Sequence, residues 1–488
     1  MHSTDRSTPY RLPWLELLLL VGVIYRVLGM RGSLWLDELW ALEWARSLPN
    51  AKAIFTGYYS ENNHFIQSAW LFIVQESGES VVHRLFSFVC SLSLLGLLFI
   101  DAKQKDGYYR WLFVLVATSY VFVLYGTEAR GYSPMLLALY LVYVSSQRLY
   151  TSQSLWSVLL FWCACLLAIA SHLGSFMFVA AVLVGSIPRL GCIRSIMIGI
   201  FPCALLLWLW VDFISKIQES GGDIGNELFA LSNLLSVGVG GPAVSIGALG
   251  LVSFLVAFVV GVWLLRLLFA WTRRGGAHCE FFLAGTVLLP ALGWALYRPE
   301  HLYARHFLPS LFVGYIFLAH LLEEAFSENK QRSRLIALSF LALFVVGNTV
   351  HVLHLAHYGR GGYDEIVKRI SVANGPIASD IPFRHEAMLR YHAERLGMSL
   401  TVLDSDERPL NMPEWARLPV SSQERETVAC WYLSINDPII AASQISDRYL
   451  LVGFYPSAAL SGWGVSLFSH QQCQSDLKRG SDSTSHES

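Results

Sequence analysis

Two adjacent carboxylates open the polar part of the sequence. Asp37 and Glu38 lie between Trp35 and Trp40, directly after the first apolar segment. A carboxylate in such a place can take a proton from an acceptor hydroxyl, which is the work of a general base. A structural interpretation stays open beside this one, because Asp37 can cap a helix that begins at Glu38, where an acid favours the helix dipole.

A second polar group lies in a very short connection between two apolar segments. It holds Glu128, Arg130 and Tyr132. A tight turn needs only Gly, Ser or Asn, so charged residues at this place call for a reason. Recognition of a substrate is one reason, and a local ion pair between Glu128 and Arg130 is the structural alternative.

A third group is cationic and precedes a late apolar segment. Arg298, Arg305 and His306 belong to it, and Lys216 lies in an earlier connection. Guanidinium groups bind phosphate through paired hydrogen bonds, so these residues are candidates for holding a phosphate. A solvated loop is the alternative. A divalent metal held by the His and acidic residues also stays open, although no ligand spacing supports it. The sequence calls for no other cofactor.

The connection from residue 31 to about 82 carries one more polar cluster. Glu61 and His64 lie in it, before the apolar segment 65–74. We take both as candidates for substrate binding. The alternative for His64 is an ordinary surface histidine.

Composition predicts a membrane protein with a soluble end. Hydrophobic residues make up 54% of the 488 residues and charged residues 15%, against about 25% charged in soluble domains. Residues 360–488 hold 28 charged residues in 129, whereas the other 359 positions hold 43. A net charge of −1 gives no reason to expect a nucleic acid partner.

The apolar segments predict eleven membrane-spanning helices, since a span needs about 20 apolar residues. We expect the first to be a retained anchor rather than a cleaved signal peptide, because it lacks a small-residue cleavage site. The expected spans lie at about 17–25, 85–100, 111–127, 131–147, two within 149–188, 195–211, 245–265, 281–297, 306–322 and 335–359.

The positive-inside rule sets the orientation. With the N-terminus inside, the inner connections hold fourteen Lys and Arg residues and the outer ones eight. The polar groups described above then all face the outer side, as does the C-terminal part. A transporter would instead place ionisable groups near the middle of its spans, where this sequence has little besides Arg26.

The C-terminal part predicts a small α/β domain over 359–475, after a membrane domain over 1–358 and before a disordered end at 476–488. Helical spacing covers 364–373 and 384–396, and strand-like runs cover 376–378, 400–403, 428–432 and 449–454. We expect an accessory domain, since it shows no nucleotide-binding or nucleophile motif. Cys430 and Cys473 can pair if this domain faces an oxidising compartment.

Three motifs in this order resemble a known family. The residues 35–38 (WLDE), 128–132 (EARGY) and 304–309 (ARHFLP) are similar to motifs of the bacterial relatives of protein O-mannosyltransferases and of lipid A aminoarabinose transferase. These are C-type (GT-C) glycosyltransferases. The resemblance covers roughly residues 10–330. It departs at Phe65, where relatives carry the proline of a His-Pro-type motif.

The resemblance implies an all-α polytopic membrane enzyme of GT-C type that uses a polyprenyl-phosphate-linked sugar as donor. The acceptor would be a glycan, a lipid or a protein. Asp37 would be the catalytic carboxylate, supported by Glu38, and the reaction would invert the sugar. The cations Arg130, Arg305 and Lys216 would receive the departing phosphate. Localisation in a bacterial inner membrane, with the site facing the periplasm, follows from the same resemblance.

Two other classes stay open. A lipid-linked glycan polymerase or ligase also places Arg and His in outer connections but depends less on an acidic pair after the first span, and a flippase should show charge within the membrane and repeat symmetry. A sensor or assembly protein would act through its C-terminal domain.

Overall fold

The computed structural model describes most of the chain between residues 13 and 473. The residues it describes are 13–57, 59–60, 62–105, 107–216, 227–243, 248–276, 278–297, 303–328, 330–372, 375–403, 416–420, 429–435, 441–443, 445 and 447–473.

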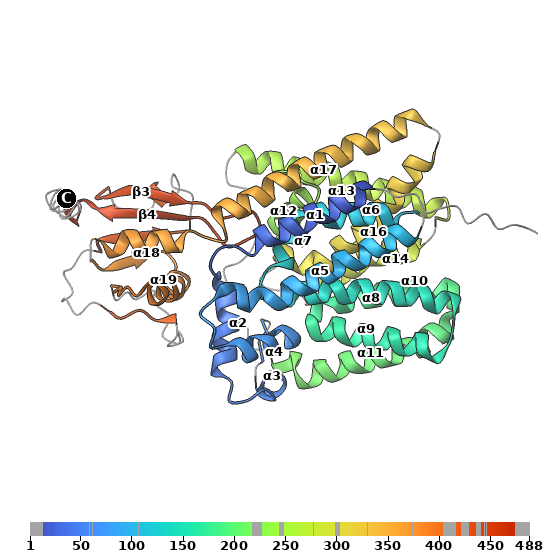
Figure 1. Cartoon of the computed structure of the whole chain (residues 1–488), viewed down its shortest axis with the longest axis horizontal. Helices are drawn as coiled ribbons and strands as arrows, with labels where there is room; N and C mark the ends of the chain where they lie inside the picture. The colour runs from blue at the N-terminus through green and yellow to red at the C-terminus, as the bar shows by residue number, and fades with distance from the viewer. Residues whose placement is uncertain are drawn as a thin grey trace, which may run out of the picture.

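A large helical body makes up the first three quarters of the chain, and a smaller domain with a sheet follows it (Figure 1). The body helices are α1 (Pro13–Gly29), α2 (Leu36–Ser47), α3 (Ala53–Thr56), α4 (Phe65–Val74), α5 (Ser80–Gln104), α6 (Tyr109–Thr118), α7 (Tyr120–Gly126), α8 (Tyr132–Thr151), α9 (Leu155–Ser171), η1 (Leu173–Ser175), α10 (Phe176–Leu190), α11 (Cys192–Asp212), η2 (Ile214–Lys216), α12 (Glu227–Gly238), α13 (Ala248–Arg273), α14 (Cys279–Leu283), η3 (Ala284–Leu288), α15 (Leu289–Tyr297), η4 (Ala304–Phe307), α16 (Leu308–Ser327) and α17 (Gln331–Tyr358).

The body belongs to a multi-pass membrane protein. Among the described residues, six helices are long and apolar enough to cross a membrane, and the bent pair α6–α7 makes a seventh if it forms one span. Helices lie over all eleven segments expected from the sequence. The predicted polytopic fold with a small C-terminal α/β domain is therefore confirmed, whereas the number of eleven spans stays a prediction.

Arg26 explains how the bundle tolerates a broken helix. The helices α6 and α7 meet at Ser119 with a bend of 65°, and such a break frees carbonyl groups from their helical partners. Arg26 in α1 is fully buried and donates to the carbonyls of Val116 at 3.3 Å and Ala117 at 3.5 Å. Asn348 Oδ1 on α17 also accepts from the backbone N–H of Tyr120 at 2.7 Å. The charge within the bundle thus stabilises a helix break.

The short helices α2, α3 and α4 lie at the end of the bundle that faces the C-terminal domain (Figure 1). The core of α2 is shared, because Leu36 and Leu39 pack with this domain and Leu42 packs with α4. The first outer connection is therefore a folded part of the body.

The C-terminal domain packs two helices against a four-stranded sheet of order β1-β2-β4-β3. Of the four strands, β1 and β2 pair in parallel, whereas β2 with β4 and β4 with β3 pair antiparallel. Its elements are α18 (Tyr363–Ser371), β1 (Ile377–Ser379), α19 (Pro382–Leu396), β2 (Trp431–Ser434), β3 (Tyr449–Tyr455) and β4 (Val465–His470).

Two details of this domain go beyond the sequence-based prediction. The strand β4 was not expected, although it is central in the sheet and buried along its whole length. Ser466 and Ser469 within it, three residues apart, and the preceding glycines interrupt the apolar pattern of a strand. Cys430 and Cys473 form a disulfide with 5.6 Å between their Cα atoms.

Candidate active site

One carboxylate oxygen, Asp37 Oδ2, binds two arginines. It lies 2.5 Å from Arg130 Nη1 and 2.9 Å from Arg305 Nη1. The three side chains come from α2, from the turn between α7 and α8, and from η4. Asp37 keeps 17% of its side-chain surface exposed and Arg305 keeps 15%. The site is therefore largely shielded from water, yet it stays open to a substrate.

Asn62 joins the carboxylate and one arginine. Its Nδ2 donates to the backbone carbonyl of Asp37 at 3.1 Å, and Arg130 Nη2 donates to its Oδ1. The N-cap of α2 is Trp35, so Asp37 lies in the first helical turn. The alternative in which the side chain of Asp37 caps a helix starting at Glu38 is wrong, since the helix begins earlier.

Aromatic rings flank both arginines. The guanidinium of Arg305 lies 4.1 Å from the ring centre of Tyr303, and that of Arg130 lies 5.0 Å from the ring centre of Tyr132. Rings at these distances favour a cation and limit its movement. The solvated-loop interpretation is therefore wrong for Arg305.

Glu38 is bound on all sides and points away from Asp37's partners. Arg84 Nε donates to its Oε1 at 2.7 Å and Arg84 Nη2 to its Oε2 at 2.5 Å, with both side chains fully buried. The backbone N–H groups of Ala129 and Trp35 donate to the same carboxylate at 2.7 and 3.2 Å. Burial alone would raise the pKa of Glu38, but the charge and hydrogen bonds of Arg84 hold it below its usual value. This arrangement favours a positioning role for Glu38.

Arg84 also binds the chain just after α1. Its Nη1 donates to the carbonyl of Gly32 at 2.8 Å, and its Nη2 donates to that of Ser33 at the same distance. The pair Glu38–Arg84 connects the start of α2 to α5. Through the N–H group of Ala129, Glu38 also connects α2 to the turn that carries Arg130.

Glu128 is fully buried beside Arg360, a residue of the chain just after α17. Its Oε1 lies 3.8 Å from Arg360 Nε. In the part of the chain that the structure describes, neither of its carboxylate oxygens has a hydrogen-bond partner. Burial raises the pKa of Glu128 to about 7, against the opposing charge of Arg360. Since Arg130 pairs with Asp37, the structural alternative of a local ion pair between Glu128 and Arg130 is wrong.

A histidine pair packs against the same turn. The rings of His64 and His172 stack with 4.7 Å between centres, and Tyr132 lies 5.0 Å from His172. Burial, followed by the charge of Arg130, lowers the pKa of His172 to about 3, and burial holds that of His64 well below its usual value. A Cβ on Gly131 would lie 2.6 Å from His64 Cβ, so this packing requires glycine. The lowered pKa values favour the neutral form of both histidines, and His172 Nδ1 already accepts from the backbone N–H of Gly174 at 3.0 Å, which leaves Nε2 as its donor.

Of the four other candidates, His306 lies beside the site, Lys216 lies near other partners, and two fall outside the description. Lys216 is exposed and lies near Asp212 and Tyr59. His306 lies in η4, next to Arg305, and its Nδ1 accepts from the backbone N–H of Tyr303 at 3.3 Å. Glu61 and Arg298 lie outside the described residues.

The sequence-based selection missed Arg84, Arg360, Asn62 and His172 as members of the site. Arg84 and His172 were visible as polar residues on the outer side, but nothing local marks their partners. Nothing in the sequence distinguishes Asn62 from its neighbour Asn63, and only the structure shows that Asn62 is the one that contacts Asp37 and Arg130. Among the described residues, no group of three or more His, Cys, Asp or Glu is arranged to hold a metal ion.

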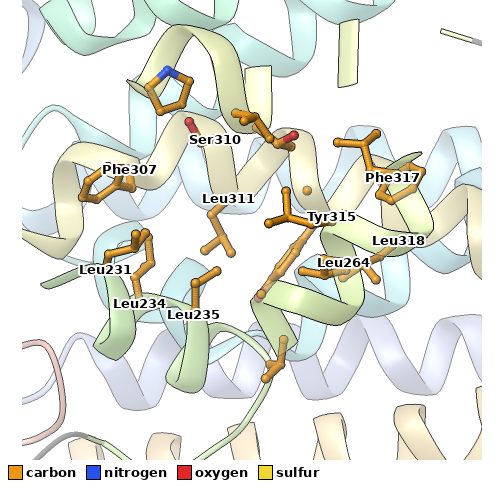
Figure 2. A pocket seen from close by; sticks show the side chains of 18 of the residues that line it. Leu231, Leu234, Leu235, Leu264, Phe307, Ser310, Leu311, Tyr315, Phe317 and Leu318 are labelled. Carbon is orange, nitrogen blue, oxygen red and sulfur yellow. The ribbon is translucent and has the colours of Figure 1, made fainter. Parts of the chain in front are cut away.

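Phe307, two residues after Arg305 in the sequence, is one of the residues that line an apolar cavity of about 470 Å³ (Figure 2). Phe307 lines one end, and Leu318 on α16 lies at the other. At 1.5 Å per residue this is a length of about 16 Å along the helix. Leucines of α12 and α13 form most of the facing wall. A cavity lined in this way can hold a hydrocarbon chain.

No protein-family model matches the chain, and no curated protein matches it. Among solved structures, the chain is similar to the crystal structure of ArnT from Cupriavidus metallidurans bound to undecaprenyl phosphate. The two share 12% identity over 94% of this chain and 98% of the other, with a TM-score of 0.44.

Proposed function

We propose that the protein is a membrane glycosyltransferase that moves a sugar from a polyprenyl-phosphate donor to a hydroxyl group of an acceptor. Asp37 is the general base, and Arg130 and Arg305 bind the donor phosphate. The observation that carries this proposal is the meeting of both arginines with one partly exposed carboxylate, and Phe307, two residues after Arg305, lines an apolar cavity.

Charge favours a monophosphate donor. Among the described side chains, Arg84 is matched by Glu38, and Arg360 is matched by Glu128 when that residue is ionised, while Arg130 and Arg305 share the single carboxylate of Asp37. An ionised Asp37 leaves one net positive charge, which suits the single negative charge of a sugar phosphodiester. A pyrophosphate-linked donor, as a glycan polymerase or ligase would use, carries a second charge without a partner here.

The charges of these groups also stay balanced through the reaction. The acceptor hydroxyl gives its proton to Asp37 while its oxygen forms a bond to the anomeric carbon. The bond from that carbon to the phosphate oxygen breaks, and its electron pair stays on the phosphate. Asp37 is then neutral, so both arginines face a polyprenyl phosphate that carries up to two negative charges. A single displacement of this kind inverts the sugar.

The proposal also includes the compartment that the site faces. We place the site and the C-terminal domain on the periplasmic side of a bacterial inner membrane. The bias of Lys and Arg supports this orientation, and the disulfide Cys430–Cys473 is stable in an oxidising compartment. Reporter fusions after Phe326 and after Tyr358 should report opposite sides, and the same side for both would contradict it.

Lipid analysis tests the function. A strain that lacks the protein should accumulate a polyprenyl-phosphate sugar, detected by mass spectrometry of its lipid extract. The wild-type gene should remove this lipid and Asp37→Asn should not, whereas Asp212→Asn, an exposed change elsewhere, should act as wild type. An unchanged lipid profile in the deletion strain would overturn the proposal.

A further inference from the structure

The C-terminal domain shares a hydrophobic core with the helix that carries Asp37. Leu36 and Leu39 of α2 are buried in one cluster with Ile366 and Met388 of the C-terminal domain. Close by, Ser33 Oγ donates to Asp364 Oδ2 of α18 at 2.9 Å. The residues before and after Asp37 therefore take their places from this domain as much as from the membrane bundle.

Arg360 makes the second contact, and it reaches the other half of the site. This side chain follows α17 and is almost fully buried. Its Nη1 donates to the carbonyl of Gly29 at 3.0 Å, and its Nη2 donates to Thr127 Oγ1 at 3.1 Å. With its Nε beside Glu128, one guanidinium joins the end of α1 to the turn that carries Arg130.

The backbone of Arg360 is fixed by the C-terminal domain itself. The N–H of Ala458 donates to the carbonyl of Gly359 at 3.1 Å, and Tyr120 on α7 donates its hydroxyl hydrogen to the carbonyl of Ala459. A Cβ on Gly462 would lie 2.2 Å from the carbonyl oxygen of Arg360. This close packing holds Arg360 over the turn and leaves little freedom for another position.

We propose that the C-terminal domain is a structural part of the active site and that Arg360 is the positioning residue of the turn 127–131. The inference deepens the proposed function, on which it rests for the role of Arg130. The turn carries two bonds that the chemistry needs: Ala129 N–H to Glu38 and Arg130 to Asp37. Because small displacements of a reacting group are costly, looser attachment of this turn should weaken donor binding and slow transfer.

Hydrogen exchange tests the positioning without any assay of activity. In Arg360→Gln of the full-length protein, amides of 127–131, Ala129 above all, should exchange faster than in wild type. Arg369→Gln, the same change at an exposed position of α18, should leave them unchanged. Wild-type protection of this turn in folded Arg360→Gln would overturn the inference.

A second variant covers the case in which Arg360→Gln fails to fold because Glu128 is left as an uncompensated buried charge. The double variant Arg360→Gln with Glu128→Gln removes both charges. Faster exchange at 127–131 in this protein supports the inference, and wild-type protection overturns it.

Binding of undecaprenyl phosphate in nanodiscs separates the inference from the proposed function. Arg360→Gln should bind this lipid about tenfold more weakly than wild type, the effect of roughly one lost hydrogen-bonded contact. In the background Arg130→Ala the same change should add little, because Arg360 acts through Arg130. Full additivity would overturn the inference. If the wild type fails to bind the lipid while exchange responds to Arg360, the proposed function fails and the positioning by the C-terminal domain stands.

Discussion

The guanidinium of Arg84 binds both oxygens of the Glu38 carboxylate, at 2.7 and 2.5 Å, and neither side chain is exposed to solvent. Such a pair is costly to break, because removing one partner leaves an uncompensated buried charge. It separates the two adjacent acids of the sequence by environment. Asp37 faces the partly exposed site, and Glu38 faces the buried interior.

We expect Glu38→Gln to destabilise the protein by about 3–5 kcal/mol, as for other broken buried pairs. Apparent melting temperature and the yield of folded protein in detergent measure this loss. The control is Glu43→Gln on the same helix, whose partner Arg46 is exposed, where a loss of about 1 kcal/mol or less is expected. A stable Glu38→Gln protein that lacks transfer would instead point to Glu38 as the base.

Asp37→Asn should fold, bind donor and fail to transfer sugar. The change removes the proton acceptor, which typically costs about 10²–10⁴ in rate. It also frees Arg130 and Arg305 from their carboxylate, so undecaprenyl phosphate should bind at least as tightly as in wild type. Single-turnover transfer and lipid binding on one preparation measure both effects. Normal transfer, or much weaker lipid binding, would contradict the assignment.

Arg305→Lys should not behave as a conservative change. Lysine places one point charge where the guanidinium binds Asp37 and lies 4.1 Å from the ring centre of Tyr303. Donor affinity should fall about 10–100-fold, the range for one or two charge-assisted hydrogen bonds. Arg305→Ala should be weaker still. Wild-type donor affinity in both variants would remove Arg305 from the phosphate site.

Gly314→Leu tests the apolar cavity. Gly314 lines the cavity, and an added Cβ there meets no atom within 4 Å, so leucine should enter the space without distorting α16. Undecaprenyl phosphate should then bind at least about tenfold more weakly, while a short-chain analogue should keep its affinity. Gly96→Leu, at an equally open position of α5, is the matched control. Equal loss for long and short chains would contradict a role in holding the chain.

The buried Glu128 should make stability depend on pH. Its pKa is raised from 4.5 to about 7, so the folded state binds the proton more tightly than the unfolded chain. The free energy of unfolding therefore falls as the pH rises from about 4.5 through 7. Glu128→Gln imitates the protonated form. Its apparent melting temperature should match wild type near pH 5 and exceed it near pH 8. The same difference at both pH values would contradict this assignment.

The sequence by itself determined the membrane body, the extra domain and the face on which the polar residues meet. Spans need long apolar segments, so their ends can be read locally, and alternate ends share one side of the membrane. Asp37, Arg130 and Arg305 were found in this way. The composition change near residue 360 likewise marked the C-terminal domain, although the buried strand β4 showed no clear pattern.

Only the tertiary structure decided which charges pair. Arg84 meets Glu38, and Arg360 meets the turn at Glu128, across long stretches of chain. No local pattern predicts such a pair. A buried ion is stabilised by a partner of opposite charge that tertiary packing brings close, and this partner can come from a distant part of the chain. For the same reason the sequence made Lys216 as good a candidate for phosphate binding as Arg130, but in the structure Lys216 lies near Asp212. The sequence determines the chemistry that each side chain can do, whereas the packing of the helices and the C-terminal domain determines which partner a buried charge meets.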